Sequence, residues 1–276
     1  MDDKKDFVRL NEELLKEWKE ANARREECRF ASDGIMFRGE TVSYDGKCPC
    51  RRTSEDNKEN KLWRTSPLRV LFITKDQNAG DGEPWDVRGE TGRRSSNKIV
   101  GHFHRNLIRQ LYAVYQTTRE QKAIYDEQRA VELYDKCALA RINVKKEAGS
   151  CSLCNSCLNR YLQRDAEFIL KQVKVLDPNV IFCCGYSVSE PQTGNAILNF
   201  LRNGGYQFEP VFRNGEKNER DAWIFYDKAT NRIAINDWHL SVRNHHDEMY
   251  DGLVDAYYDF LQKTPEFLPE KTVISK

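Results

Sequence analysis

The sequence predicts an α/β protein of three layers (α/β/α), with helices on both faces of a central, mainly parallel sheet of about four strands. Short apolar runs alternate along the chain with longer stretches in which apolar residues recur at helical spacing. Polar residues and glycines follow the apolar runs. Strands that alternate with helices favour a parallel sheet, because parallel neighbours need a crossover connection between them.

Each predicted element follows from its apolar pattern. Strands are expected at 70–74, 138–144 and 180–185, with a late pair at 222–226 and 232–236. Helices are expected at 6–27, 103–116, 119–136, 157–176, 192–203 and 247–262. Residues 28–66 lack a long period and are expected to form an ordered loop region. The expected organisation is an N-terminal helix and cysteine-containing loop over 1–66 packed on the core, an α/β domain over 67–264, and a tail over 265–276.

Composition restricts the class of protein. At 276 residues and 39% hydrophobic, the chain is long and apolar enough for one substantial domain. A net charge of +1 neither demands nor excludes nucleic acid, because a total hides local basic patches. No stretch approaches the roughly 18 apolar residues of a membrane span, and the charged N-terminus lacks a signal-peptide core. We expect a cytoplasmic protein with no membrane partner and no evident obligate protein partner.

Polar side chains follow three of the predicted strands. Lys75–Asn78 comes after the first, Asn143 ends the second, and the loop 237–244 with His239 follows the last. Ligands of open α/β sheets bind at the carboxyl ends of the strands. These residues are therefore candidates for a common site.

In this order, the strand ends resemble the motifs of the uracil-DNA glycosylase superfamily. Thr74–Asn78 matches a first motif of the form Gly-Gln-Asp-Pro-Tyr, and Ile142–Lys146 matches a central strand that ends Asn-Val-Val-Lys. The order of Cys157, a helix, Pro178 and a strand ending in Gly185 is similar to the iron–sulfur branch of that family. His239–Asn244 stands where the family has His-Pro-Ser-Pro-Leu-Ser, without its prolines. The resemblance covers roughly residues 68–262 and implies the fold and activity of a DNA glycosylase.

The resemblance also assigns roles to individual residues. Asp76 is the expected acid, which stabilises an oxocarbenium-like sugar or orients water. His239 is the expected donor to the departing base, and Asn143 the amide that reads the edge of a flipped base. Ser241 and Arg243 belong to the last motif and are expected to contact DNA, with Arg243 at the position of a leucine wedge.

Departures from the family pattern concern the base pocket. Asn78 replaces a tyrosine that excludes the methyl group of thymine, and Gln77 lies beside it. The family's stacking phenylalanine is missing from its usual place, although Trp85 and Phe103 lie further along the chain. A roomier, more polar pocket fits a base other than uracil, such as the glucosylated hydroxymethylcytosine that some family members remove in defence against phage.

Basic residues near these motifs are candidate phosphate contacts. They are Arg93, Arg94, Lys145 and Lys146. Any one of them alone is more often a solvated surface charge.

The cysteines form two groups that are typical of a metal site. Cys48 and Cys50 precede the first strand, and Cys151, Cys154 and Cys157 follow the second. This arrangement predicts a structural metal site, and its spacing fits a [4Fe–4S] cluster and zinc equally. The cysteines lie where the iron–sulfur branch of the family keeps its cluster ligands, so the resemblance implies [4Fe–4S], with zinc as the alternative. The alternative interpretation, without a metal, is a group of free thiols.

Three functions stay open at this point. The first is a glycosylase that flips a base and hydrolyses its N-glycosidic bond, leaving an abasic site. The second is an inactive DNA-binding protein of the same fold. The third is a metal-stabilised interaction module, in which Asp76 caps a turn, Asn143 bonds a turn and His239 is a packed histidine.

Overall fold

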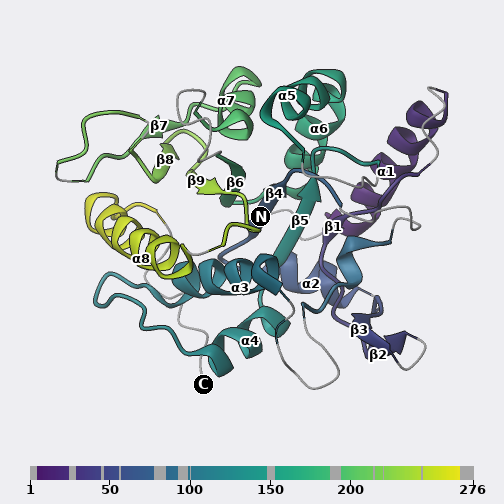
Figure 1. The fold of residues 1–276 in the computed structure, drawn as a ribbon, viewed down its shortest axis with the longest axis horizontal. Coiled ribbons are helices and arrows are strands. Elements are labelled where there is room, and N and C mark those ends of the chain that lie inside the picture. Colours follow the sequence, from purple (N-terminus) through teal and green to yellow (C-terminus); the bar gives the residue numbers. More distant parts are fainter. Residues whose placement is uncertain are drawn as a thin grey trace.

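The structure is a computed structural model. It describes residues 5–24, 29–44, 47–55, 57–77, 85–92, 99, 101–147, 153–186, 194–213, 215–219, 221–243 and 245–267. Within these residues the chain forms an α/β fold around a mixed sheet of seven strands (Figure 1).

The predicted strands and helices occur in the predicted order, together with elements that the sequence pattern did not predict. The helices are α1 (Phe7–Ala23), α2 (Lys58–Thr65), α3 (Gly101–Gln116), α4 (Glu127–Lys136), α5 (Asn155–Arg164), α6 (Ala166–Leu176), α7 (Ala196–Asn203) and α8 (His246–Lys263), with a short 3-10 helix η1 (Val87–Gly89). The strands are β1 (Gly34–Ile35), β2 (Thr41–Tyr44), β3 (Lys47–Arg52), β4 (Val70–Thr74), β5 (Leu139–Asn143), β6 (Val180–Tyr186), β7 (Glu209–Pro210), β8 (Ile224–Asp227) and β9 (Arg232–Trp238).

The sheet has the strand order β1-β5-β4-β6-β9-β8-β7. Its four middle strands, β5, β4, β6 and β9, run parallel. The prediction of about four mainly parallel strands was wrong about the margins of the sheet, because β1 adds to one edge and β8 and β7 to the other, all antiparallel. β2 and β3 form a separate two-stranded sheet.

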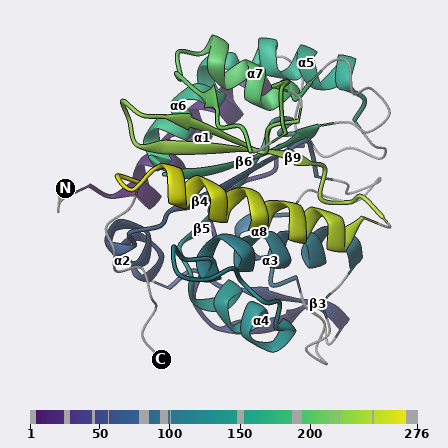
Figure 2. The same ribbon diagram turned by 90° about the vertical axis from the view of Figure 1, so that its left-hand side faces the viewer.

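Helices cover both faces of the sheet (Figure 2). One core contains Leu71 and Ile73 of β4 with side chains of α1, α5, α6 and α7. The other contains Val70 and Phe72 of the same strand with side chains of α3, α4 and α8. Successive side chains of a strand point to opposite faces, so a continuous apolar run such as β4 is buried on both sides. Among the described residues, no helix is long and apolar enough to cross a membrane.

Local interactions end or split several predicted helices. The helix predicted over 119–136 begins only at Glu127, after Asp126 caps it by accepting the Arg129 N–H. The helix predicted over 157–176 is two helices, divided at Asp165. The region 28–66, predicted as loop, contains β1, β2, β3 and α2.

Candidate functional site

The candidate residues that follow the predicted strands lie at one end of the sheet, where the parallel strands have their carboxyl ends. Thr74 pairs with Asn143 where β4 and β5 end, and the Val144 N–H donates to the Thr74 carbonyl beyond the last pair. β9 reaches the same end, with Trp238 paired to Tyr186 of β6. The chain leaves β4 toward α3 on one face and leaves β5 toward α5 on the other. Neighbouring strands with such opposite connections mark the place where open α/β sheets bind ligands.

Asn143 carries an amide with an unused donor. The side chain is 1% exposed, and its Oδ1 lies 2.5 Å from the Thr74 hydroxyl, which donates to it. Its Nδ2 is buried and has no hydrogen-bond partner among the described residues. An unpaired buried donor costs about 1–3 kcal/mol. A ligand that offers an acceptor at this point would remove that cost.

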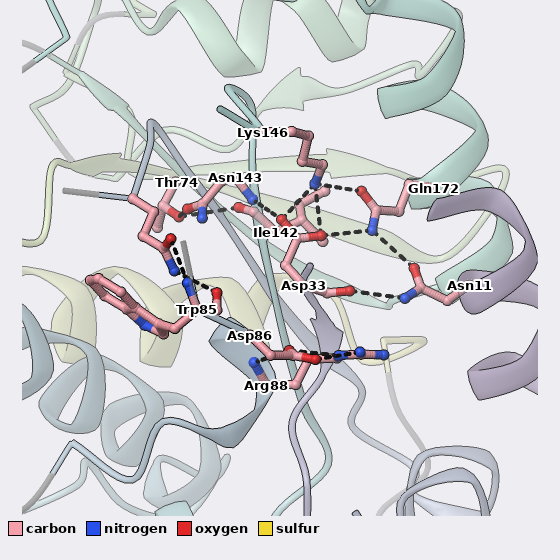
Figure 3. Close-up of polar contacts among 11 residues, drawn as sticks. Asn11, Asp33, Thr74, Trp85, Asp86, Arg88, Ile142, Asn143, Lys146 and Gln172 are labelled. Atoms are coloured by element: carbon pink, nitrogen blue, oxygen red, sulfur yellow. Dashed lines mark hydrogen bonds and ion pairs between the residues drawn. The ribbon is translucent and has the colours of Figure 1, made fainter. Parts of the chain in front are cut away.

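A closed polar network underlies Asn143 (Figure 3). Asp33 accepts the Asn143 main-chain N–H at 2.8 Å and two contacts from Lys146 Nζ, at 2.7 and 2.5 Å. Gln172 of α6 bonds both members of this ion pair. Its Nε2 also donates to Asn11 of α1, which in turn donates to the Asp33 carbonyl. The network therefore joins the end of β5 to α1 and α6.

Lys146 corrects one of the sequence predictions. Its side chain is fully buried against Asp33 and lies over the ring of Trp18, with Nζ 4.5 Å from the ring centroid. Burial lowers the pKa of Lys146, and the charge of Asp33 opposes that change. A lysine enclosed in this way cannot reach a DNA phosphate, so its role is structural.

Asp76 follows β4 by two residues and is partly buried. Its Oδ2 is shielded from solvent and has no hydrogen-bond partner among the described residues. Burial raises the pKa of Asp76, while the charges of Lys145 and Lys75 lower it. The site thus holds a carboxylate with a free oxygen and two nearby cations.

His239 begins a tight turn immediately after β9. The Val242 N–H donates to the His239 carbonyl, and the Ser241 N–H donates to His239 Nδ1 at 3.3 Å. Burial, followed by the charges of Lys75 and Arg141, lowers the pKa of His239 to about 4. The imidazole is therefore neutral at neutral pH. Because Nδ1 accepts a hydrogen bond, its proton is assigned to Nε2, which can act as a donor.

Phe103 of α3 lies beside His239, with ring centroids 6.3 Å apart. The Arg141 guanidinium covers the Phe103 ring at 4.7 Å. Arg141 is also paired with Glu90 at 2.5 Å, and Glu90 contacts His104 at 3.2 Å. Burial opposes ionisation of Glu90, but the charge of Arg141 and the hydrogen bond from His104 hold its pKa well below the usual range. Arg141 and Glu90 were not predicted from the sequence, although a charged residue inside the apolar strand β5 was a usable signal for Arg141.

Trp85 is held in place by residues on both sides of it. Gln77 Nε2 donates to the Trp85 carbonyl at 2.7 Å, and the Trp85 N–H donates to Gln77 Oε1. The indole N–H bonds to Glu90. Gln77, predicted to contact substrate, uses both ends of its amide to position Trp85. Asn78 lies outside the described residues.

The predicted DNA contacts have different surroundings. Ser241 and Arg243 are exposed in the turn after His239, and Lys145 is half-buried with its Nζ 5.6 Å from the ring centroid of Tyr161. Arg93 and Arg94 lie outside the described residues.

Asp237 is a second buried acid, two residues before His239. Gln110 of α3 donates to its Oδ1 at 2.9 Å, the Trp238 N–H donates to the same oxygen, and Cys184 contacts Oδ2. Burial raises the pKa of Asp237 to about 8, in spite of these hydrogen bonds.

The structure describes only part of the predicted five-cysteine ligand set, because Cys151 and the side chains of Cys48 and Cys50 lie outside its described part. β3, which carries Cys48 and Cys50, lies on the side of α4, where Arg52 pairs with Asp135 at 2.7 Å. α5 lies on the opposite face of the sheet (Figures 1 and 2).

The two described cysteines of the second group lie at the start of α5. Cys154 caps the helix and accepts the Cys157 N–H, and hydrogen bonds with Ser156 and then Cys157 lower the pKa of Cys154 to about 7. Cys151 lies outside the described residues, and within those residues no group of three or more His, Cys, Asp or Glu side chains is arranged to hold a metal ion. The iron–sulfur cluster and the alternative zinc stay predictions, and no step proposed below uses them.

A scan against protein-family models, a search of curated proteins and a search of solved structures each found no match for this chain. Support for a function therefore comes from the geometry of the site and from the motifs themselves.

The adjacent lysines 145 and 146 give a matched test of the site. Lys146→Ala leaves Asp33 buried without its cation and should lower the free energy of unfolding by about 3–5 kcal/mol. Lys145→Ala should change it by less than about 0.5 kcal/mol. Chemical denaturation measures both. Equal losses in the two variants would contradict the placement of Lys146.

The raised pKa of Asp237 should make the free energy of unfolding depend on pH. Its carboxyl binds a proton more tightly in the folded protein, with a pKa near 8, than in the unfolded chain, near 3.8. The stability that it contributes is complete below about pH 4 and falls by about 1.4 kcal/mol per unit as the pH rises toward 8. Asp237→Asn should remove this slope. Urea unfolding of both proteins between pH 5 and 8 tests the prediction, and parallel curves would refute it.

Proposed function

We propose that the protein is a DNA glycosylase that receives a flipped base at the ends of β4, β5 and β9 and hydrolyses its N-glycosidic bond, leaving an abasic site. The observation that carries this proposal is a pair of buried atoms, Asn143 Nδ2 and Asp76 Oδ2, that lie at neighbouring strand ends and have no hydrogen-bond partner in the described part of the chain. A hydrogen-bond donor and an acceptor that are both available at neighbouring strand ends fit a nucleotide. The donor can bind the polar edge of its base, and the acceptor can act at the bond that is broken. The resemblance of the strand-end motifs to those of the uracil-DNA glycosylase superfamily supports the same proposal, and the four middle strands run parallel, as that resemblance implies.

The chemistry assigns each of these groups a step. Asn143 donates to an acceptor on the Watson–Crick edge of the flipped base. Asp76, as a carboxylate, stabilises positive charge on the sugar or orients the attacking water. His239 donates its Nε2–H to the base oxygen that becomes negative as the bond breaks. A neutral imidazole suits this role, and the cations Lys75 and Arg141 favour both the neutral ring and an anionic leaving base.

The test of activity uses duplex DNA that carries uracil, thymine mismatches or phage-type modified cytosines, with alkali-labile abasic sites as the product. Asp76→Asn and His239→Ala should each lower the single-turnover rate by about 10²-fold or more. Arg129→Gln, a change on the exposed surface of α4, is the control. Undiminished cleavage in Asp76→Asn, Asn143→Ala and His239→Ala would refute the site, and binding without cleavage by the wild type would favour the inactive DNA-binding alternative.

The pH profile separates the acid from the imidazole. Burial raises the pKa of Asp76 above its ordinary 3.8, and the proposed step needs the carboxylate. The rate should therefore fall as the pH drops through this raised pKa. His239→Gln, which cannot titrate, should retain the acidic limb at a lower rate, whereas the residual rate of Asp76→Asn should lack it. An acidic limb in Asp76→Asn would assign the titration to another group.

The proposed substrate class is a bulky modified base such as glucosylated hydroxymethylcytosine, with a role in defence against phage. Trp238, the residue before His239, lines a cavity of about 320 Å³. The lining combines aromatic faces with charged and amide groups, from Tyr186, Trp223, Trp238, Arg213, Glu216, Asp221 and Asn236. Arg213 is paired with Glu216 at 2.6 Å. Aromatic faces and hydrogen-bonding groups suit a neutral group that bears hydroxyls.

Substrate preference tests this assignment. Glucosylated DNA should be cleaved faster than uracil-containing DNA, and Trp238→Ala should reduce that preference by about tenfold or more. The rate of the same variant on uracil-containing DNA is the internal control. A proportional loss on both substrates would mean that Trp238 supports the site in general and does not select the base.

A further inference from the structure

The turn after β9 is held from outside by one buried side chain of α3. Asn106 is 2% exposed, and its Nδ2 donates to the Leu240 carbonyl at 2.7 Å and to the Val242 carbonyl at 3.2 Å. These carbonyls lie on both sides of Ser241, in the segment that begins with His239. One amide thus fixes both halves of the turn.

Two histidines determine which way this amide faces. His246 Nδ1 contacts Asn106 Oδ1. Because an amide oxygen only accepts hydrogen bonds, the proton is assigned to His246 Nδ1. The Nε2 of the neutral ring then accepts from His102 Nδ1, 2.9 Å away, and the two rings stack with centroids 5.0 Å apart. The order of donation is His102 to His246 to Asn106 to the turn.

The charges around His246 favour the neutral ring that this order requires. Burial, then His102, Arg109 and Arg105, lower the pKa of His246, and Asp247 opposes them. Arg109 itself pairs with Asp247 at 2.7 Å. A neutral His246 keeps both its donor and its acceptor in use.

We propose that Asn106 is a positioning residue that fixes the place and the tautomer of His239, and that His246 and His102 orient Asn106 for this task. The Ser241 N–H reaches His239 Nδ1 only while the turn keeps its shape, and Asn106 bonds the carbonyls on both sides of Ser241. The catalytic consequence rests on the proposed function. The effect on the turn does not, because it can be measured without a reaction.

The experiment compares two variants that break the order of donation with two that preserve it. Asn106→Asp has the same shape but no N–H donor, and His246→Leu removes the donor that orients the amide. His246→Asn keeps an N–H for Asn106 at the position of Nδ1, and His245→Gln changes the neighbouring histidine, which bonds Glu248 instead. His246 is only half-buried, so its variants test the proposal even if Asn106→Asp does not fold.

Three measurements follow the turn and the reaction separately. Amide hydrogen exchange at 239–243 should accelerate by about tenfold or more in the two breaking variants. Nitrogen NMR should show His239 losing its single Nε2–H tautomer in the same two proteins. The single-turnover rate should fall by about 10²-fold with a smaller change in KM. His246→Asn and His245→Gln should resemble the wild type in all three.

The outcomes separate this inference from the proposed function. Unchanged exchange and an unchanged His239 tautomer in His246→Leu and Asn106→Asp would overturn it, even if the rate of cleavage fell. Faster exchange and a mixed tautomer in these variants would support it, and would do so even if the wild type cleaved none of the DNA substrates, a result that would overturn the proposed function alone.

Discussion

The buried ion pair of Asp33 and Lys146 is the interaction on which the site depends. Neither side chain reaches solvent, so the pair bears a large cost of desolvation that only complete hydrogen bonding can offset. Lys146 makes three contacts with Asp33 and Gln172, and Asp33 also accepts the Asn143 N–H. Removing any one of these side chains would leave a buried charge or dipole without a partner, so the network holds the end of β5 in one position. The position of the Asn143 side chain is fixed with it.

Close packing reinforces the same network. Gly34, which follows Asp33, has a φ of +135°, and a Cβ there would lie 2.4 Å from Asn11 Nδ2. Asn11 uses that nitrogen to bond the Asp33 carbonyl. Glycine is therefore required for both backbone conformation and space, which allows α1 to approach the edge strand β1 closely enough to complete the network.

Burial acts on Asp76 and His239 in the same physical way and changes their pKa values in opposite directions. Removing water disfavours the charged form of any group, so the pKa of the acid rises and the pKa of the imidazole falls. The charge of Lys75 acts in the same direction on both groups. It lowers both pKa values, so it stabilises the Asp76 carboxylate and disfavours protonation of His239. The proposed hydrolysis needs both of these forms.

Much of the sheet could be predicted because a strand buried on both faces leaves a continuous apolar run. β4 was predicted at its observed limits, and β5, β6, β8 and β9 to within a few residues. The margins of the sheet could not be predicted in this way, since β1 has two residues and depends on its pairing with β5. A strand that exists through a distant partner leaves no periodic pattern of its own.

The sequence could predict a residue of the candidate site only where the position of that residue at the end of a strand places it there. Asp76, Asn143 and His239 follow strand ends, and parallel strands bring their carboxyl ends to one end of the sheet. Lys145 and Lys146 are indistinguishable in the sequence, yet one is half-exposed and the other is paired with a carboxylate 113 residues away. The sequence likewise leaves the Gln77 amide available to bind a substrate, but in the structure this amide bonds the main chain of Trp85. Only long-range contacts decide between such alternatives.

The buried polar residues of α3 are a signal in the sequence that a division of helix positions into apolar and polar faces overlooks. Asn106 and Gln110 are one turn apart and are buried on a helix whose neighbouring positions, Leu107 and Leu111, pack in the core. Burying an amide is unfavourable unless its hydrogen bonds are made. Asn106 makes them with the turn after His239 and with His246. The Gln110 Nε2 donates to Asp237 just before that turn, while the Gln110 Oε1 has no partner among the described residues. Two amides at helical spacing in an apolar face therefore mark the helix that supports the loop around His239. The spacing alone could have indicated this helix, but only the fold shows that it supports His239.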